Sequence, residues 1–194
     1  MISSSPFHAA LRVGLFSFVI IGLVTLVFHG TKDKIAANKR NALLQNLQAV
    51  LPQASYDNDL ANDIIQQDGY TIYRARKAGQ PVAAVISTST TQGYNGDIQL
   101  LIAINIKGEV MGVRVLSHQE TPGLGDKIEL KKSDWILGFQ HKSLQHTLLS
   151  QWAVQRDGGI FEQFTGATIT PRAIVNKVKT TGLFFLQHQQ SIFQ

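Results

Sequence analysis

The longest apolar stretch of the chain lies near its start and is the strongest signal in the hydrophobic pattern. From Val13 to Thr31 no residue carries a formal charge, and Leu, Ile, Val and Phe dominate. This length is close to the ~20 helical residues that cross a hydrocarbon core about 30 Å thick. We therefore predict a transmembrane helix over residues 13–31, after a short N-terminal segment of residues 1–12. A cleaved signal peptide is the alternative, but its apolar region is usually only about 7–15 residues long.

The pattern after this span is helical at first and then more polar. Apolar residues recur at roughly helical spacing up to Pro52, which predicts an amphipathic stalk helix over residues 32–52. Residues 57–67 are mostly polar, with Leu60, Ile64 and Ile65 at positions i, i+4 and i+5. We expect a second short helix there.

From Tyr70 onward the pattern changes to that of β-strands. Residues 70–76 alternate, residues 81–87 are rich in Val, Ile and Ala, and residues 99–115 form two strands around Lys107-Gly108. These segments predict an antiparallel sheet.

The C-terminal part mixes short and long elements. Residues 129–146 suggest one or two short helices, residues 152–154 a strand, and the segment from Pro171 a long helix that packs on the sheet. The whole predicts one α+β domain over residues 53–194, large enough to have its own core.

Composition narrows the chemistry that is available to the chain. Cysteine is absent, which excludes disulfides, thiolate metal sites and iron–sulfur ligation, so redox work requires a bound cofactor. The six histidines show no ligand spacing, and we predict no metal site. The net charge of +5 comes from dispersed basic residues without interleaved aromatics, which argues against nucleic-acid binding.

A small, hydroxyl-bearing turn precedes the predicted C-terminal helix. It reads Thr165-Gly166-Ala167-Thr168, and Thr170 and Pro171 fit the N-cap and first position of a helix. The turn would then face free backbone N–H groups at the positive end of the helix dipole, where a phosphate can bind. An ordinary capped turn is the alternative for this segment taken alone.

Two further segments have a recognisable pattern. The first reads His118-Gln119-Glu120-Thr121-Pro122-Gly123-Leu124-Gly125, and the second reads Gly93-Tyr94-Asn95-Gly96 and leads into a strand. Read alone, the first could be a turn that joins a strand to a helix.

With the Thr165–Thr168 turn, these segments stand in family order behind one membrane span and resemble the signatures of a family of membrane flavoproteins. In that family the last threonine of the turn carries FMN through a phosphoester bond. The family includes the G subunit of the Rnf electron-transport complex and the C subunit of the sodium-pumping NADH:quinone oxidoreductase. The short extramembrane domain favours the Rnf protein.

The resemblance implies a cofactor site and a set of partners. Thr168 would carry covalent FMN, and Glu120 would bond a ring N–H or the ribityl chain. The other implied cofactor-binding residues are Tyr94, Thr121, Pro122, Gly123, Leu124, Gly125, Thr165, Gly166 and Ala167. The implied partners are the membrane, other Rnf-type membrane subunits, and a flavin transferase that attaches the FMN. That transferase normally recognises Asp three residues before the first Ser or Thr of the turn, where this chain has Glu162.

The resemblance also implies a function. The chain would relay electrons within an ion-translocating NADH/ferredoxin complex and would catalyse no complete reaction alone. The alternatives that stay open are a flavin-free membrane-anchored binding or scaffold domain, the FMN subunit of the sodium-pumping quinone reductase, and a flavin-containing membrane regulator.

The orientation in the membrane is indicated in opposite ways by charge and by resemblance. Lys32, Lys34, Lys39 and Arg40 follow the span while Arg12 precedes it, which places the C-terminal domain in the cytoplasm by the positive-inside rule. The family places this domain in the periplasm, anchored in the bacterial inner membrane by a single span. We follow the family.

Overall fold

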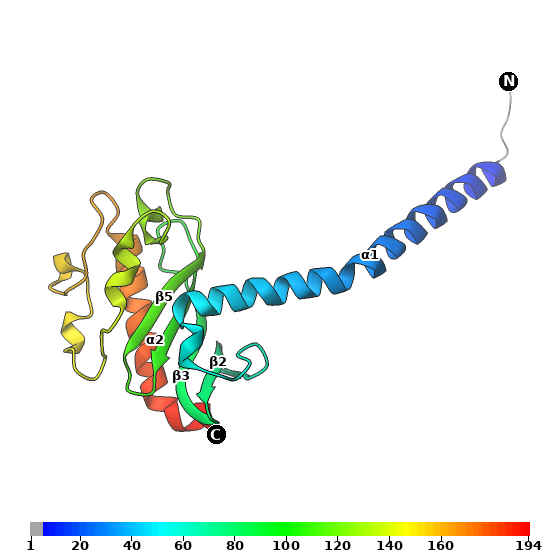
Figure 1. Cartoon of the computed structure of the whole chain (residues 1–194). Helices are drawn as coiled ribbons and strands as arrows, with labels where there is room; N and C mark the ends of the chain where they lie inside the picture. Colours follow the sequence, from blue (N-terminus) through cyan, green and yellow to red (C-terminus); the bar gives the residue numbers. More distant parts are fainter. Residues whose placement is uncertain (1–5) are drawn as a thin grey trace. The chain divides into compact units, whose positions relative to one another are not determined.

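The computed structural model describes residues 6–194, which fall into two compact units divided after Ala42 (Figure 1). The first unit is helical from Pro6, and its helix α1 (Pro6–Val50) continues into the second. Both the predicted span and the predicted stalk lie on α1, and the boundary between them stays a prediction. Residues 1–5 of the predicted N-terminal segment lie outside the described residues.

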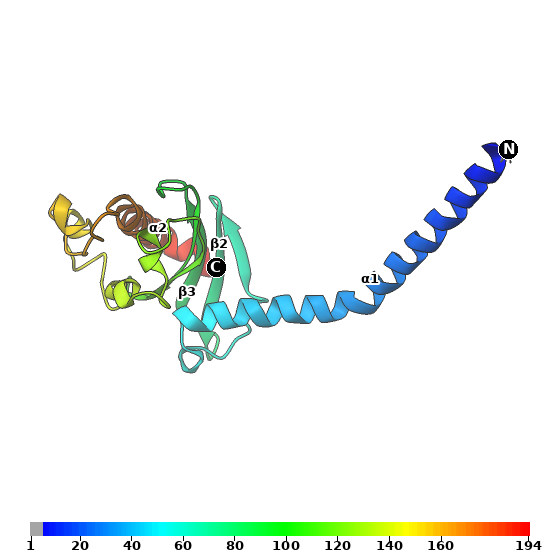
Figure 2. The same ribbon diagram turned by 90° about the horizontal axis from the view of Figure 1, so that it is seen from above.

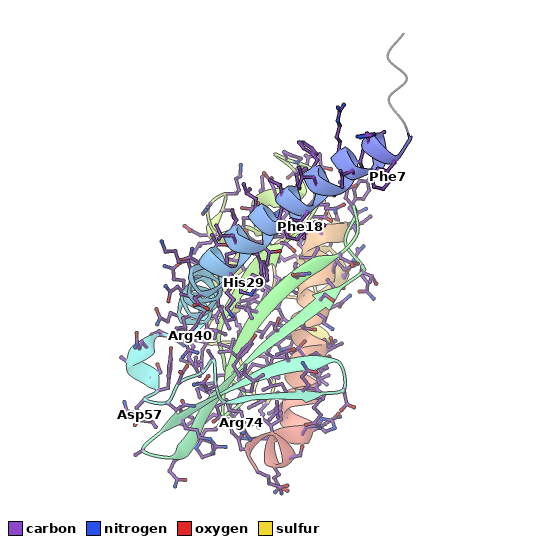
Figure 3. All side chains as sticks on the ribbon, turned by 90° about the vertical axis from the view of Figure 1, so that its right-hand side faces the viewer. Phe7, Phe18, His29, Arg40, Asp57 and Arg74 are labelled. Atoms are coloured by element: carbon purple, nitrogen blue, oxygen red, sulfur yellow. The ribbon has the colours of Figure 1, made fainter. Side chains whose placement is uncertain are left out.

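The first part of α1 exposes large apolar side chains around its whole circumference. Phe7, Phe18 and Leu26 are 72%, 76% and 75% exposed, and Figure 3 shows side chains projecting along this helix. In the described part of the chain, α1 is the helix long and apolar enough to cross a membrane, with a mean hydropathy of 2.4 in its most apolar window. Such a surface suits lipid.

The second unit is built on an antiparallel sheet of five strands in the order β1-β2-β3-β4-β5. Their bounds are β1 (Ile64–Gln67), β2 (Tyr70–Lys77), β3 (Gln80–Thr90), β4 (Ile98–Asn105) and β5 (Val110–Ser117). The predicted antiparallel sheet and the strands from Tyr70 onward are confirmed. Asp68-Gly69 and Ala78-Gly79 form two-residue hairpin turns in which every residue has positive φ, which matches the right-handed twist of the strands.

The predicted helix over residues 57–67 is wrong. Residues 64–67 form β1, which pairs with β2 from Ile64 opposite Tyr73 to Gln67 opposite Tyr70. The Asp68-Gly69 turn, whose two residues readily adopt positive φ, returns the chain directly into β2 and sets this pairing. Tertiary pairing therefore overrides a weak helical pattern.

Alternation along the strands divides the core between the two faces of the sheet. On β4, Leu100, Ile102 and Ile104 belong to one cluster, whereas Leu101 and Ala103 belong to the other. The first cluster is covered by helix α2 (Ile169–Phe193), as Figures 1 and 2 show. The second is covered by Leu47 and Val50 at the end of α1, by Leu51 directly after it, and by residues of the loop before β1.

Short 3₁₀-helices connect the longer elements. They are η1 (Gln53–Ser55), η2 (Gly125–Ile128), η3 (Asp134–Phe139), η4 (Leu149–Gln151) and η5 (Gln155–Asp157). Residues 129–146 therefore contain one short helix, η3, as expected. The predicted strand over residues 152–154 is wrong, because only Val154 forms a bridge, with Phe161, while Trp152 is fully buried and packs against aromatic rings.

Candidate functional site

A pocket of about 380 Å³ lies where three loops meet the start of α2. This volume is within the range of about 300–1,000 Å³ that is usual for small-molecule sites. Its walls come from the β3–β4 loop, the loop after β5, and the turn before α2. The residues that line it are Tyr94, Glu120, Thr121, Leu124, Gly125, Gly166, Ala167, Thr168, Ile169 and Thr170.

The turn before α2 is held by contacts on its N-terminal side. Ala167 N–H donates to the carbonyl of Phe164 at 3.1 Å, and Gly166 between them has φ of +83°. Trp135 fixes the approach to the turn, because its Nε1–H donates to the carbonyl of Glu162 at 2.8 Å and its ring lies 5.1 Å from that of Phe164. The turn is therefore a fixed element of the pocket wall.

Helix α2 begins two residues earlier than the sequence predicts. Ile169 is its first residue and Thr168 occupies the N-cap position, so the expected N-cap role of Thr170 is wrong. The Thr170 side chain is buried and its hydroxyl donates to Oε2 of Glu120. Thr168 has helical φ and ψ and makes no side-chain capping bond to any described residue. Within the described residues the Thr168 hydroxyl therefore has no hydrogen-bond partner, and Thr168 lines the pocket.

The backbone N–H groups at the N-cap and in the first residues of α2 also lack a hydrogen-bond acceptor in the described part of the chain. Among residues 6–194, the N–H groups of Thr168, Ile169 and Thr170 donate to no protein acceptor. Pro171 has no N–H, and the first bond to the turn is from Arg172 N–H to the carbonyl of Thr168, at 3.3 Å. Free N–H groups at the start of a helix are donors to which an anion can bind, and Thr168, whose hydroxyl is also free, is one of the three residues.

Glu120 is a buried carboxylate in the pocket wall, only 4% exposed. Its Oε1 accepts from the backbone N–H of Asn95 at 3.0 Å, and its Oε2 accepts from the Thr170 hydroxyl. Its own N–H donates to Nδ1 of His118 at 3.0 Å. Because that nitrogen accepts, the His118 proton lies on Nε2, which is 2.8 Å from Oε1 of Glu129.

The rest of the loop after β5 is shaped by Asp126. Gly123 N–H donates to Oδ1 of Asp126 at 2.8 Å, and this bond is the main cause that holds the pKa of Asp126 below its ordinary value of 3.8. Gly123 has φ of +79°, which a residue with a side chain would adopt only under strain. Leu124, between this turn and η2, is 43% exposed at the pocket.

The structure brings together most of the site residues expected from the sequence. Tyr94, Glu120, Thr121, Leu124, Gly125, Gly166, Ala167 and Thr168 line the pocket. Pro122, Gly123 and Thr165 do not line it and are exposed.

Sequence reasoning missed other residues of the site. Ile169 and Thr170 line the pocket, and Asn95 joins two of its loops through its backbone N–H and through its side chain, whose Nδ2 donates to Oγ1 of Thr121 at 3.1 Å. The position of Asn95 within the Gly93–Gly96 segment was the available signal.

Comparisons with known proteins show the family to which the chain is similar. A family described as an FMN-binding domain matches residues 93–181, which include all the residues that line the pocket, and one described as the RnfG N-terminal region matches residues 1–50. The chain is 44% identical to the G subunit of the ion-translocating oxidoreductase complex of Pseudoalteromonas atlantica, over 94% of this chain and 89% of the relative. It is 46% identical to the proteins of the same name from Shewanella oneidensis, covering 94% and 91% of the two chains, and Haemophilus influenzae, covering 94% and 93%.

Proposed function

The chain belongs to the G subunits of ion-translocating oxidoreductase complexes, the Rnf family, and on this basis we propose that it carries FMN covalently on Thr168. In this role it is a membrane-anchored electron-transfer subunit of such a complex. The observation that carries the proposal is the uncommitted Thr168 hydroxyl at a pocket whose wall also presents three free helix N–H groups.

The residues of the pocket fit FMN in size and in chemistry. A phosphate on Thr168 would meet the free N–H groups of α2, which favour anions by roughly 0.3–1 kcal/mol, and up to ~2 kcal/mol when partly buried. Leu124 and Ile169 offer apolar surface to a flat ring, and Tyr94 offers an aromatic one. When bound, FMN supplies electron-transfer chemistry that the side chains of this chain lack.

The chain's own residues bind and orient the group. The tether on Thr168 keeps the local concentration of cofactor high and prevents its loss from the protein. The turn that holds Thr168 is fixed by Trp135 and by the start of α2, so the attachment point has a defined position relative to the loops. No side chain of the pocket is required to form or break a covalent bond during electron transfer.

The attachment itself requires a separate enzyme. We propose that a flavin transferase modifies Thr168 and that Glu162 takes the place of the aspartate in its recognition segment. The side chain of Glu162 is exposed while its backbone carbonyl is bonded to Trp135, so the carboxylate is accessible to another protein.

We also propose that the domain of residues 53–194 lies in the periplasm and that α1 anchors it in the inner membrane. The support is the family resemblance, the exposed apolar surface of α1 and the absence of cysteine, which lets the domain tolerate an oxidising compartment. The basic residues after the span are the opposing signal.

The test of attachment is denaturing electrophoresis of the full-length chain made in a host with a flavin transferase. The wild type and Thr165→Val should both show flavin fluorescence at the band of the polypeptide, and Thr168→Val should show none. Thr165→Val makes the same change at an exposed residue that does not line the pocket, so its effect on attachment should be milder than that of Thr168→Val. A wild-type band without fluorescence would support the flavin-free scaffold instead.

A further inference from the structure

Glu120 is a buried charge with an unusual set of partners. Among residues 6–194 it forms no ion pair, and its two carboxylate oxygens accept from groups on two other segments of the pocket. A buried carboxylate is costly unless hydrogen bonds and favourable dipoles compensate it. Here the compensation comes from Asn95 N–H, the Thr170 hydroxyl and the positive end of α2.

The surrounding backbone leaves room for this carboxylate. A Cβ atom on Gly93 would lie 2.7 Å from Oε1 of Glu120. A Cβ atom on Gly125 would lie 2.9 Å from Cβ of Glu120 and 3.0 Å from its Oε2. A Cβ on Gly125 would therefore crowd Glu120 directly, whereas Gly93 is required first by its own loop, because a Cβ there would overlap the carbonyl oxygen of Gly96. The close packing leaves Glu120 little freedom to change its position.

From this geometry we infer that Glu120 is a positioning residue, which holds two walls of the pocket together. Through Asn95 it fixes the loop that carries Tyr94, and through Thr170 it fixes the start of α2 that follows Thr168. In this inferred role Glu120 acts on the cofactor indirectly, and the ring or ribityl contact expected from the sequence stays a prediction for a residue that also lines the pocket. The role in cofactor loading rests on the proposed FMN site, whereas the role in ordering the two segments does not.

The first test is hydrogen exchange of the full-length, flavin-free chain, followed by mass spectrometry of its peptides. Glu120→Gln removes the charge and replaces one carboxylate oxygen by an amide nitrogen that cannot accept, so that charge-assisted bonds are lost or weakened. We therefore expect exchange to become about tenfold faster in residues 91–97, which include the bonded N–H of Asn95, and in residues 167–174, which include the bonded N–H groups of Ala167 and Arg172. Exchange in residues 71–87 should stay unchanged. Glu109→Gln is the matched control, because Glu109 accepts from the side chain of Asn105 in the β4–β5 hairpin, away from the residues that line the pocket.

Thr170 supplies a second, smaller perturbation of the same bond. Thr170→Val removes the hydroxyl and should speed exchange in residues 167–174, whereas Thr170→Ser retains it and should behave as wild type. The double variant of Glu120→Gln and Thr170→Val should exchange no faster in that segment than Glu120→Gln alone, because both changes break one contact. These variants keep the inference testable even if Glu120→Gln does not fold.

The second test measures the fraction of chains that carry flavin, by intact mass, after expression with a flavin transferase. We expect both Glu120→Gln and Thr170→Val to lower this fraction several-fold, and Thr170→Ser and Glu109→Gln to leave it unchanged. Loss of loading in Glu120→Gln with full loading in Thr170→Val would overturn the inference and indicate direct contact with the cofactor. Wild-type exchange in both segments of Glu120→Gln, or an equal increase across the whole domain, would also overturn it.

The two tests separate this inference from the proposed function. A wild-type chain that carries no flavin would contradict the FMN proposal, and the exchange experiment would still decide the role of Glu120. If the wild type carries flavin but hydrogen exchange is unchanged in the flavin-free Glu120→Gln and Thr170→Val variants, only the positioning role of Glu120 is contradicted.

Discussion

Gly125→Ala adds a single methyl group at the most crowded point of the pocket wall. The added Cβ would lie 2.9 Å from Cβ of Glu120 and 2.9 Å from Oγ1 of Thr170. Both distances are well below the 3.5–4.0 Å of a favourable contact between carbon atoms. Glu120 and Thr170 are 4% and 1% exposed, so neither side chain can turn into solvent.

The expected cost follows from this crowding. Inserting a methylene-sized group into a packed region typically costs about 1–3 kcal/mol, and here it must also displace the Glu120–Thr170 hydrogen bond. We expect Gly125→Ala to be less stable than wild type by about 2 kcal/mol and to load less flavin.

Gly138→Ala is the matched control for this change. Gly138 lies in η3 as Gly125 lies in η2, neither has positive φ, and an added Cβ on Gly138 would meet no atom within 4 Å. Without a clash, Ala should be neutral or should stabilise by up to ~1 kcal/mol, because it restricts the unfolded chain.

The assay is urea unfolding of the full-length chain in detergent, followed by tryptophan fluorescence. The two tryptophans of the chain, Trp135 and Trp152, both lie in the second unit and report its unfolding. Equal stability of the Gly125→Ala and Gly138→Ala variants would refute the claim that the pocket wall is tightly packed around Glu120.

Three further expectations concern other parts of the chain. The folded-state pKa of Asp126 is depressed, so its bond to Gly123 stabilises the fold above pH 3.8 and stabilises it less as the pH falls through the folded-state pKa. The difference in unfolding free energy between wild type and Asp126→Asn, measured by urea unfolding, should therefore shrink from pH 5.5 to pH 3. A constant difference would contradict this. Leu47→Ala should lower the unfolding free energy by about 2–5 kcal/mol in the same assay, because Leu47 is fully buried. Asn46→Ala, at an exposed position of the same helix, should change it by no more than ~0.5 kcal/mol. A similar loss for both variants would show that the end of α1 is not part of the domain core. An alkaline phosphatase fused after Gln194 should be active and a fluorescent protein at the same place dark, and the reverse pattern would place the domain in the cytoplasm, as the charges after the span suggest.

The elements that the sequence predicted well are those with strong local signals. The uninterrupted apolar stretch, the alternation of residues 70–76 and the apolar positions of the last helix each correspond to one element of the structure. The three loops of the site could be recognised because their glycines and hydroxyl residues form distinctive short patterns.

The elements that were missed depend on contacts with residues outside the segment that carried the pattern. Thr170 has the composition of an N-cap, but its hydroxyl bonds to Glu120, fifty residues earlier in the chain, and the helix begins before it. Residues 64–67 have a weak helical pattern, but they pair with β2 across a two-residue turn. The Glu120 partner is not visible in the sequence around Thr170, whereas the Asp68-Gly69 turn beside residues 64–67 is a local hairpin signal that favours the strand.

The central claim is that Thr168 carries FMN, and peptide mapping tests it most directly. Trypsin cuts after Arg156 and Arg172, so the turn lies in a single peptide, which contains Thr165, Thr168 and Thr170. After expression with a flavin transferase, this peptide should gain the mass of one FMN less one water, and fragmentation should place the gain on Thr168. An unmodified peptide, or a gain placed on Thr165 or Thr170, would contradict the account.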